Sequence, residues 1–350
     1  MLKAALIGTG FIAREHLAAL SRLPNVEIGG VCDLSAALAE ATAERFGVRK
    51  WYTDYSKMLT DIRPDLVHIT TPPTSHFTIA RESLAAGVNV LCEKPITVEY
   101  EEFVELKGLA TRAGLMLMEN QNCRFNSSIL RILELVASGE LGEIVDVHVA
   151  VFLNVNANGS RYVDRNAPHP CLGMPGGAIA DFLTHIGYLA CMFAGPPLDV
   201  RTVWSKRVTD SLLPADEFRA LINGERATAY VGFSANAQPN GFWVRVVGTK
   251  MQAETNLFEA PRLTFRRLRP GVQPLMTFVD GVAESRGVLG GAIGGLWRKV
   301  KGTSSYDGLA ELISRTYLAL EAKDAQPVPL EEIDAVARLV AAFTNGEQML

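Results

Sequence analysis

The sequence predicts two domains of different classes, a doubly wound α/β domain over residues 1–122 and an α+β domain over residues 123–350. The length supports two domains, because 350 residues are about twice the size of an ordinary domain. Short apolar runs alternate with amphipathic helical stretches in the first range, and this alternation is typical of a parallel sheet covered by helices. In the second range, runs with period-two alternation follow one another with few helices between them. That pattern favours a large, mainly antiparallel open sheet.

Strand and helix signals alternate along the first domain. Ser35 precedes a helical stretch as an N-cap, and Gly47, Gly87 and Gly114 each follow one, where a helix C-terminus favours a positive φ. The expected strands are 3–7, 26–32, 50–52, 66–69, 88–92 and 115–119, and the expected helices are 11–22, 35–46, 55–60, 74–86 and 98–113.

The second domain is expected to begin with a helix and to continue mainly as strands. The expected helices are 126–138, 178–193, 309–322 and 331–343, and the expected strands are 145–152, 200–208, 219–222, 228–234, 242–247 and 263–266. This order of elements predicts an α+β domain rather than a second set of strand–helix–strand units.

The composition is that of a globular protein with a sizeable core, at 48% hydrophobic and 21% charged residues. A net charge of -4 with no block of lysine or arginine argues against nucleic acid as a partner. The five cysteines are dispersed without a CxxC pair, which argues against a disulfide framework and against a structural zinc site. No apolar stretch is long enough to cross a bilayer. We therefore expect a cytoplasmic protein with no metal and no stable membrane insertion.

A glycine-rich turn, GTGFIA, lies between the first expected strand and the first expected helix. Gly8 permits the tight turn, Gly10 lets the backbone approach a pyrophosphate, and Ala13 lets helix and strand pack closely. The N–H groups of the helix N-terminus then face the phosphates. Asp33 ends the second strand, where a carboxylate accepts both ribose hydroxyls of NAD and repels the extra phosphate of NADP. The sequence therefore predicts NAD, with NADP left open because a nearby arginine would pair with its phosphate.

Lys94 directly follows the fifth expected strand, in the tripeptide Glu93-Lys94-Pro95. Ligands lie beyond the carboxyl ends of the strands in an open parallel sheet, so Lys94 is expected at the cofactor crevice. Pro95 restricts Lys94 to extended geometry. Partial burial there lowers the pKa of a lysine below about 10.4, as a proton-transfer group requires.

Asp181 and His185 are four residues apart in GGAIADFLTH, on an expected helix, and this spacing places both on one face. An imidazole can take a hydroxyl proton while hydride leaves the same carbon, and a carboxylate can hold its charge and orientation. By itself, the pair fits a surface ion pair or a pair of buried, hydrogen-bonded groups equally well.

Three motifs of the first domain together resemble the Gfo/Idh/MocA oxidoreductase family. They are GTGFIA, then TTPPTSH at 70–76, then AAGVNVLCEKP at 85–95. The resemblance implies a Rossmann nucleotide-binding domain, a second domain for substrate binding and oligomerisation, and a nicotinamide-dependent enzyme acting on sugars, cyclitols or similar polyols. The cofactor contacts that it implies are Gly8, Gly10, Phe11, Ile12, Asp33, Thr70, Thr71, Pro72, His76, Glu93, Lys94 and Asn122.

The second signature of that family, GGxxxDxxxH, is also present and implies a catalytic group of Lys94, Asp181 and His185. Two positions depart from the family, with Leu183 where glycine is common and Tyr188 where another acid often follows the histidine. We expect hydride transfer between C4 of the nicotinamide and a carbinol carbon, with His185 or Lys94 handling the hydroxyl proton and Asp181 supporting the charge. Two other functions stay open: a redox-neutral, NAD-using lyase or glycoside hydrolase, and a non-catalytic NAD-binding regulator.

A long polar segment precedes that signature and is expected to line the substrate pocket. The residues assigned to substrate are Arg124, Arg161, Tyr162 and His169. Arginines suit an anionic group such as a carboxylate or the diphosphate of a nucleotide sugar, although an ordinary exposed loop fits equally well. The glycine-rich segment 286–301 favours a mobile or subunit-contacting loop over a membrane-surface helix, because its glycines disfavour helix. The open sheet face predicts a homodimer or homotetramer.

Overall fold

The structure is a computed structural model, and it describes residues 1–157, 159–160, 162, 169–209, 211, 213–259, 263–267, 278–279, 281–282, 285 and 308–345. The chain forms two compact units. The first comprises Met1–Asn122 and Tyr306–Ala337, and the second comprises Cys123–Ser305 and Arg338–Leu350.

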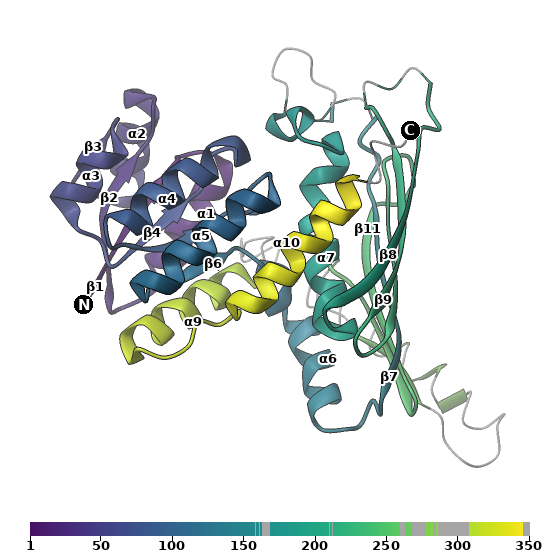
Figure 1. Ribbon diagram of the computed structural model, residues 1–350. Coiled ribbons are helices and arrows are strands. Elements are labelled where there is room, and N and C mark those ends of the chain that lie inside the picture. Colours follow the sequence, from purple (N-terminus) through teal and green to yellow (C-terminus); the bar gives the residue numbers. More distant parts are fainter. Residues whose placement is uncertain are drawn as a thin grey trace. The chain divides into compact units, whose positions relative to one another are not determined.

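The first unit is built on a parallel sheet, sheet A (Figure 1). Its strands are β1 (Leu2–Ile7), β2 (Val26–Cys32), β3 (Trp51–Tyr52), β4 (Leu66–Ile69), β5 (Asn89–Cys92) and β6 (Leu117–Glu119). Their order across the sheet is β3-β2-β1-β4-β5-β6, which reverses between β1 and β4. At such a reversal the connections leave a crevice beyond the carboxyl ends of the strands. The doubly wound parallel sheet predicted from the sequence is thereby confirmed.

Helices alternate with these strands along the chain. They are α1 (Phe11–Leu20), α2 (Ala36–Phe46), α3 (Tyr55–Ile62), α4 (His76–Ala85) and α5 (Tyr100–Ala113). The predicted caps are present: the Ser35 hydroxyl accepts the N–H of Leu38 at the start of α2, and Gly47, Gly87 and Gly114 have φ values of 66°, 78° and 64°. These caps explain why α2 begins, and why α2, α4 and α5 end, close to their predicted positions.

Helix α9 (Leu309–Ala322) and the first half of α10 (Leu330–Asn345) belong to the first unit, although they come last in the chain. Helix α9 packs against α1, and Tyr317 of α9 is hydrogen-bonded to His68 of β4. Lys107 of α5 forms an ion pair of 2.9 Å with Asp334 of α10. The division at 1–122 and 123–350 placed these helices in the second domain. The structure differs because packing between distant segments, which the local pattern does not encode, assigns them to the first unit.

The second unit is built on a mainly antiparallel sheet, sheet B. Its strands are β7 (Ile144–Phe152), β8 (Pro197–Ser205), β9 (Glu217–Gly224), β10 (Thr228–Ser234), β11 (Gly241–Gly248), β12 (Met251–Asn256) and β13 (Thr264–Arg267). They lie in the order β13-β12-β11-β7-β10-β9-β8, with β7 and β10 parallel and the other neighbours antiparallel. The predicted open sheet is confirmed. Strand β12 was not predicted, because its sequence MQAETN is too polar to show an apolar alternation.

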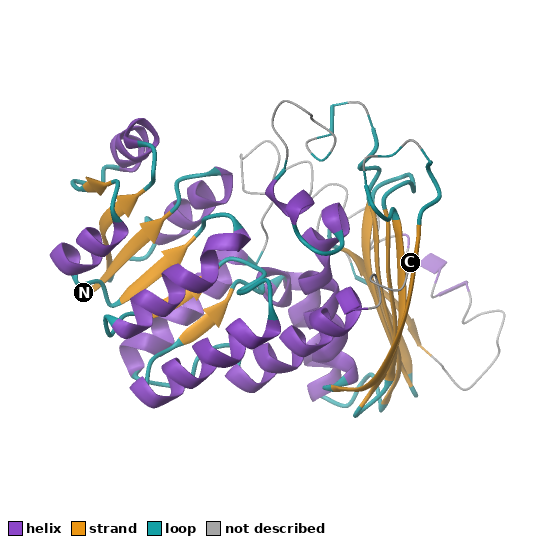
Figure 2. Cartoon of the chain, turned by 45° about the horizontal axis from the view of Figure 1, so that its top comes forward, coloured by secondary structure: helices purple, strands orange, loops and turns teal. Residues whose placement is uncertain are grey.

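One face of sheet B carries the helices of the second unit, α6 (Ser127–Ala137) and α7 (Ala180–Ala194) (Figure 2). Helix α7 contacts β7, β9 and β10. The expectation that no apolar stretch is long enough to cross a bilayer is wrong by length and composition, because Gly177–Ala194, alone within the described residues, reaches that length with a mean hydropathy of 1.4. This stretch is, however, 83% buried inside the protein. It is therefore the core helix of this unit. The indole of Trp204 on β8 donates to the carbonyl of Phe343 over 2.9 Å and attaches the end of α10 to the sheet.

Candidate active site

The glycine-rich turn connects β1 to α1, and its two glycines have different roles. Gly8 has a φ of +91°, and a Cβ there would lie 2.8 Å from backbone atoms of Thr70 and Thr71. Gly8 is therefore required both for its left-handed conformation and for the close approach of the loop after β4. Gly10 has a φ of -68° at the N-cap of α1, and a Cβ there would meet no atom within 4 Å. The N-terminus of α1 is thus open in front of Gly10, as a phosphate site requires, while Ala13 behind it is fully buried.

Asp33 lies directly after β2, and its carboxylate is held by the glycine turn. Thr9 donates to Oδ2 from its backbone N–H over 2.8 Å and from its hydroxyl over 2.9 Å. The N–H of Ser35 donates to Oδ1 over 2.9 Å. A carboxylate has about four acceptor positions, so Asp33 keeps capacity for further donors. The sequence analysis did not predict a role for Thr9, although a small hydroxyl residue between two glycines could have indicated a hydrogen-bond donor in this turn.

The residues around this carboxylate fit the adenosine half of NAD. Phe11 and Leu34, which follow the turn and Asp33 in sequence, are 64% and 94% exposed. Ile12, also assigned to the cofactor, is partly exposed. An oriented acid beside an open helix N-terminus matches ribose hydroxyls next to a pyrophosphate. Contacts of these individual side chains with the cofactor stay predictions.

The loop after β4 is tied to the glycine turn and to the loop after β5. The Thr70 hydroxyl donates to the carbonyl of Gly8 over 2.6 Å. His76 is completely buried, with Nδ1 2.7 Å from the Pro95 carbonyl oxygen and Nε2 2.8 Å from that of Thr71. Burial lowers the pKa of His76, and the two carbonyl acceptors oppose that shift. The ring of His76 therefore joins two loops, and its predicted contact with the cofactor stays a prediction. Pro72, assigned to the cofactor with its neighbours, is the N-cap of the short 3-10 turn Pro73–Ser75.

Lys94 lies in the loop after β5, at the carboxyl edge of sheet A, and its peptide bond to Pro95 is cis. The buried carboxylate of Glu93 beside it has Oε1 2.9 Å from Nε2 of His16 and accepts from the amide of Asn120. Burial alone raises the pKa of Glu93, but the hydrogen bonds from His16 and Asn120 and the charge of Lys94 oppose it, and the pKa is lowered. Glu93 is therefore an ionised carboxylate next to Lys94. The sequence did not single out His16 or Asn120.

In the second unit, Asp181 lies in the first turn of α7 and is held by a tyrosine from the polar segment. The hydroxyl of Tyr162 donates to Oδ2 of Asp181 over 2.6 Å. The rings of Tyr162 and His169 lie 4.8 Å apart between centroids, and Nδ1 of His169 lies 2.8 Å from the Cys171 sulfur. The structure thus brings together one residue predicted for catalysis and two predicted for substrate binding.

His185 lies one turn after Asp181 on α7 and is paired with Tyr188. Its Nδ1 is 2.6 Å from the Tyr188 hydroxyl, and that hydroxyl oxygen also accepts the N–H of Cys123 over 3.1 Å. If the Tyr188 hydroxyl donates to Nδ1, a neutral His185 carries its own proton on Nε2. Tyr188, where the family often has an acid, is fully buried, and so is Leu183. Both departures from the family are therefore core residues of α7.

The remaining predicted residues lie in several places. Asn122 and Arg124, in a short 3-10 turn after β6, are both buried. Arg161 and the segment 286–301 lie outside the described residues. Lys94, which is predicted to be catalytic, belongs to the first unit, and the predicted pair Asp181 and His185 belongs to the second. Within the part of the chain that the structure describes, no group of three or more His, Cys, Asp or Glu side chains could hold a metal ion.

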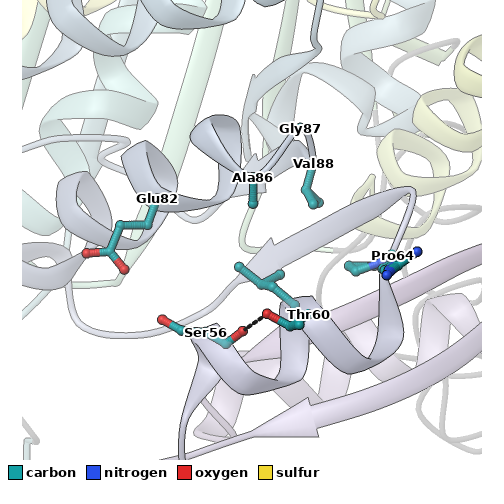
Figure 3. A pocket seen from close by; sticks show the side chains of 9 residues that line it. Ser56, Thr60, Pro64, Glu82, Ala86, Gly87 and Val88 are labelled. Carbon is teal, nitrogen blue, oxygen red and sulfur yellow. Dashed lines mark hydrogen bonds between the residues drawn. The ribbon is translucent and has the colours of Figure 1, made fainter.

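A groove of about 520 Å³ lies between α3 and α4 (Figure 3). It is lined by Pro64, Gly87 and Val88 among others. Pro64 precedes β4 and Val88 precedes β5, so the groove lies at the amino ends of these strands. Nucleotides bind beyond the carboxyl ends in such sheets. The groove is therefore at the wrong edge of sheet A for the cofactor.

Comparison with known proteins supports the assignment of both units. Residues 2–121 match a family model described as an oxidoreductase family with an NAD-binding Rossmann fold, and residues 129–254 match the GFO/IDH/MocA C-terminal domain. An uncharacterised oxidoreductase of Schizosaccharomyces pombe is 33% identical over 228 residues, which are 63% of this chain and 60% of that protein. The D-glucoside 3-dehydrogenase of Escherichia coli is 32% identical over 144 residues, which are 41% of each chain. The matches thus span less than two thirds of these relatives.

A solved structure shares the complete fold. It is that of an NAD-binding oxidoreductase from Klebsiella pneumoniae, with a TM-score of 0.81 and 22% identity over 99% of this chain and 96% of that one. The two family matches fall in the two structural units and together cover more than half of the chain. The first includes the glycine turn and Asp33, and the second includes Asp181 and His185. The chain therefore belongs to the GFO/IDH/MocA oxidoreductase family, and its first unit is the NAD-binding Rossmann domain of that family.

Proposed function

We propose that this protein is an NAD-dependent dehydrogenase that transfers hydride between the nicotinamide and a carbinol or ketone carbon of a sugar, cyclitol or nucleotide sugar. The observation that carries the proposal is the orientation of the Asp33 carboxylate. Thr9 and Ser35 donate hydrogen bonds to it, and the carboxylate can still accept hydrogen bonds from a ligand. A carboxylate there favours NAD over NADP, since it repels a 2′-phosphate. The name of the Escherichia coli relative, a D-glucoside 3-dehydrogenase, supports the reaction class.

The residues of this chain would move the hydroxyl proton, and the cofactor would supply the hydride acceptor at its nicotinamide ring. With Nδ1 of His185 2.6 Å from the Tyr188 hydroxyl, a neutral His185 that accepts from Tyr188 would carry its proton on Nε2, which suits a hydrogen-bond donor to the substrate oxygen. In the oxidative direction, Lys94 is then the residue that takes the proton. Asp181 supplies the negative charge that stabilises the group that becomes protonated. The buried carboxylate of Glu93 accepts the Lys94 backbone N–H and anchors that loop.

The catalytic assignment is tested by Lys94→Met and His185→Ala, with Lys57→Met on the exposed face of α3 as the control. A panel of polyols and nucleotide sugars is assayed through the absorbance of the reduced cofactor. We expect turnover to fall by about 100-fold or more in both site variants, with NAD affinity within about threefold of wild type. Near-wild-type turnover in both would refute the assignment.

Two further outcomes separate this proposal from its alternatives. Product formation without accumulating reduced cofactor would assign the chain to the redox-neutral enzymes. Tight NAD binding without turnover of any member of the panel would favour the non-catalytic regulator. A titration in which NADP binds more tightly than NAD would contradict the role given to Asp33.

We also propose that the protein assembles through the open face of sheet B and works in a reducing compartment such as the cytoplasm. Val203, Leu221 and Tyr230 on this face are 64%, 41% and 51% exposed. Leu221 and Tyr230 are direct cross-strand partners, so their side chains are adjacent on one face. All five cysteines are free, which suits a reducing environment. Sedimentation velocity of wild type and Tyr230→Glu tests the assembly, and a wild-type monomer would contradict it.

A further inference from the structure

A continuous chain of four polar side chains runs through the core of the first unit. Tyr317 of α9 lies 3.0 Å from Nε2 of His68 on β4. Nδ1 of His68 lies 2.9 Å from Nδ1 of His16 on α1, and Nε2 of His16 lies 2.9 Å from Oε1 of Glu93. Both histidines are completely buried, and Tyr317 and Glu93 are 3% and 7% exposed. Four segments distant in sequence therefore contribute to one buried hydrogen-bonded chain, referred to here as the buried chain.

The positions of the protons in the buried chain follow from the charge at one end. The Glu93 carboxylate only accepts, so Nε2 of His16 carries a proton. If His16 is neutral, its Nδ1 accepts, and Nδ1 of His68 must then be the donor. Nε2 of His68 in turn accepts the hydroxyl proton of Tyr317. Every donor has an acceptor in this arrangement, and all three bonds point toward Glu93.

One additional proton would reverse two of these bonds. A protonated His16 would donate from Nδ1 to His68, whose Nε2–H would then donate to the Tyr317 oxygen. The Tyr317 hydroxyl proton would have no acceptor among the described residues, in a site where a buried unsatisfied donor costs about 1–3 kcal/mol. Burial also holds the pKa of His68 well below 6.5, and the neighbouring His16 lowers it further. The arrangement in which all three bonds point toward Glu93 leaves no such unsatisfied donor.

Glu93 connects the buried chain to the carboxyl edge of sheet A. Its Oε1 accepts the side-chain amide of Asn120, and its Oε2 accepts the backbone N–H of Lys94 over 3.2 Å. Glu93 thus joins the ends of β5 and β6. It also decides which way the Asn120 amide faces, and that orientation leaves Oδ1 of Asn120 as a buried acceptor with no partner among the described residues.

The charged and titratable groups that face the buried chain come from several elements. They are Lys94 after β5, Glu119 on β6, His76 at the start of α4 and Asp65 before β4. None of them is a hydrogen-bond partner of His16 or His68 among the described contacts. Which atom donates in each hydrogen bond of the buried chain is therefore set by the four residues of that chain.

We propose that the buried chain is a positioning device: it holds Glu93 as an oriented carboxylate, with His16 as the Nε2–H tautomer and His68 as the Nδ1–H tautomer, and thereby fixes the backbone of Lys94 and the side chain of Asn120. His16, His68 and Tyr317 act through Glu93 and touch no reacting atom. The consequence for catalysis rests on the proposed function of Lys94. The predicted tautomers and the anchoring of the loop that contains Lys94 do not depend on that function.

The tautomers are tested by long-range 1H–15N spectra of the full-length protein, with His16→Gln and His68→Gln used to assign the two rings. We expect the two rings to show opposite tautomers as stated, with the proton on Nε2 of His16 and on Nδ1 of His68. A His68 ring in the Nε2–H form would overturn the proposal.

The anchoring is tested by amide hydrogen exchange of the peptide that contains Lys94. In His16→Leu the donor to Glu93 is lost, and we expect exchange to quicken by about tenfold or more. In His16→Gln an amide donor can replace it, so exchange is expected within about threefold of wild type. Tyr317→Phe removes only the terminal hydroxyl and is compared with Tyr55→Phe, which removes another tyrosine hydroxyl bound to a carboxylate, that of Glu82.

The outcomes distinguish the buried chain from the proposed enzyme activity. Faster exchange at Lys94 in His16→Leu and Tyr317→Phe, but not in Tyr55→Phe, supports the positioning device. Unchanged exchange in both chain variants overturns it. If exchange quickens while kcat stays at the wild-type value, the positioning device stands and the catalytic role of Lys94 fails. A fall in kcat with unchanged NAD affinity supports both.

Discussion

Replacing each glycine of the GTG turn by alanine should separate folding from cofactor binding. A Cβ on Gly8 would meet the backbone of Thr70 and Thr71 at 2.8 Å, at a φ of +91°. The conformation costs about 1–2 kcal/mol for a residue other than glycine, and overpacking typically adds about 1–3 kcal/mol. We therefore expect Gly8→Ala to lower the free energy of unfolding by about 2–5 kcal/mol.

Gly10→Ala should leave the free energy of unfolding within about 0.5 kcal/mol of wild type, because its Cβ meets no atom within 4 Å and its φ is -68°. The added methyl group would instead occupy the space in front of α1, so the Kd for NAD should rise by about tenfold or more, or ~1.4 kcal/mol. Urea unfolding without cofactor and a fluorescence titration with NAD measure the two effects. A Gly10→Ala protein with wild-type affinity would refute the placement of the pyrophosphate at this turn.

Three other substitutions test contacts described above. Thr9→Val removes the hydroxyl donor to Asp33 and should raise the Kd for NAD by about 3- to 10-fold in a fluorescence titration, and unchanged affinity would count against ribose binding at this acid. Trp204→Phe leaves the buried Phe343 carbonyl without its donor, and urea unfolding should show a loss of about 1–3 kcal/mol. Below pH 6.5 unfolded chains bind a proton at His68 that the folded protein excludes, so wild type should lose about 1.4 kcal/mol per pH unit from this residue as the pH falls. His68→Gln lacks that contribution, and parallel pH profiles of the two proteins in urea unfolding would contradict the lowered pKa.

Features of the fold that depend on neighbours in sequence could be predicted. The cap at Ser35 and the positive φ of Gly47 depend on a few adjacent residues, and the structure confirms them. The parallel sheet follows from the alternation of strands and helices, because the chirality of such connections admits few topologies. The place of Asp33 at the end of β2 could be predicted for the same reason, since a strand and its following turn are local.

Features that depend on distant contacts could not be predicted. His68 and Tyr317 are 249 residues apart in sequence, and no local pattern pairs them. Strand β12 forms because it pairs with its neighbours β11 and β13, and its own polar sequence does not indicate a strand. One signal was available: His68 interrupts the apolar strand LVHI, and a polar residue in a fully buried strand requires a hydrogen-bond partner. It indicates that a partner exists without saying where.

The return of α9 and the first half of α10 to the first unit has a consequence for biosynthesis. The strands of sheet A are translated before the second unit. Tyr317 and the surface of α9 that covers α1 are translated after it. At a synthesis rate of about 5–20 residues per second, this delay is on the order of ten seconds or more. Throughout that interval His68 has no hydroxyl partner, and the side of α1 that contacts α9 is uncovered on the ribosome. The strands of the nucleotide-binding unit are thus translated before the second unit, but the unit is completed only after α9 and the start of α10 have emerged.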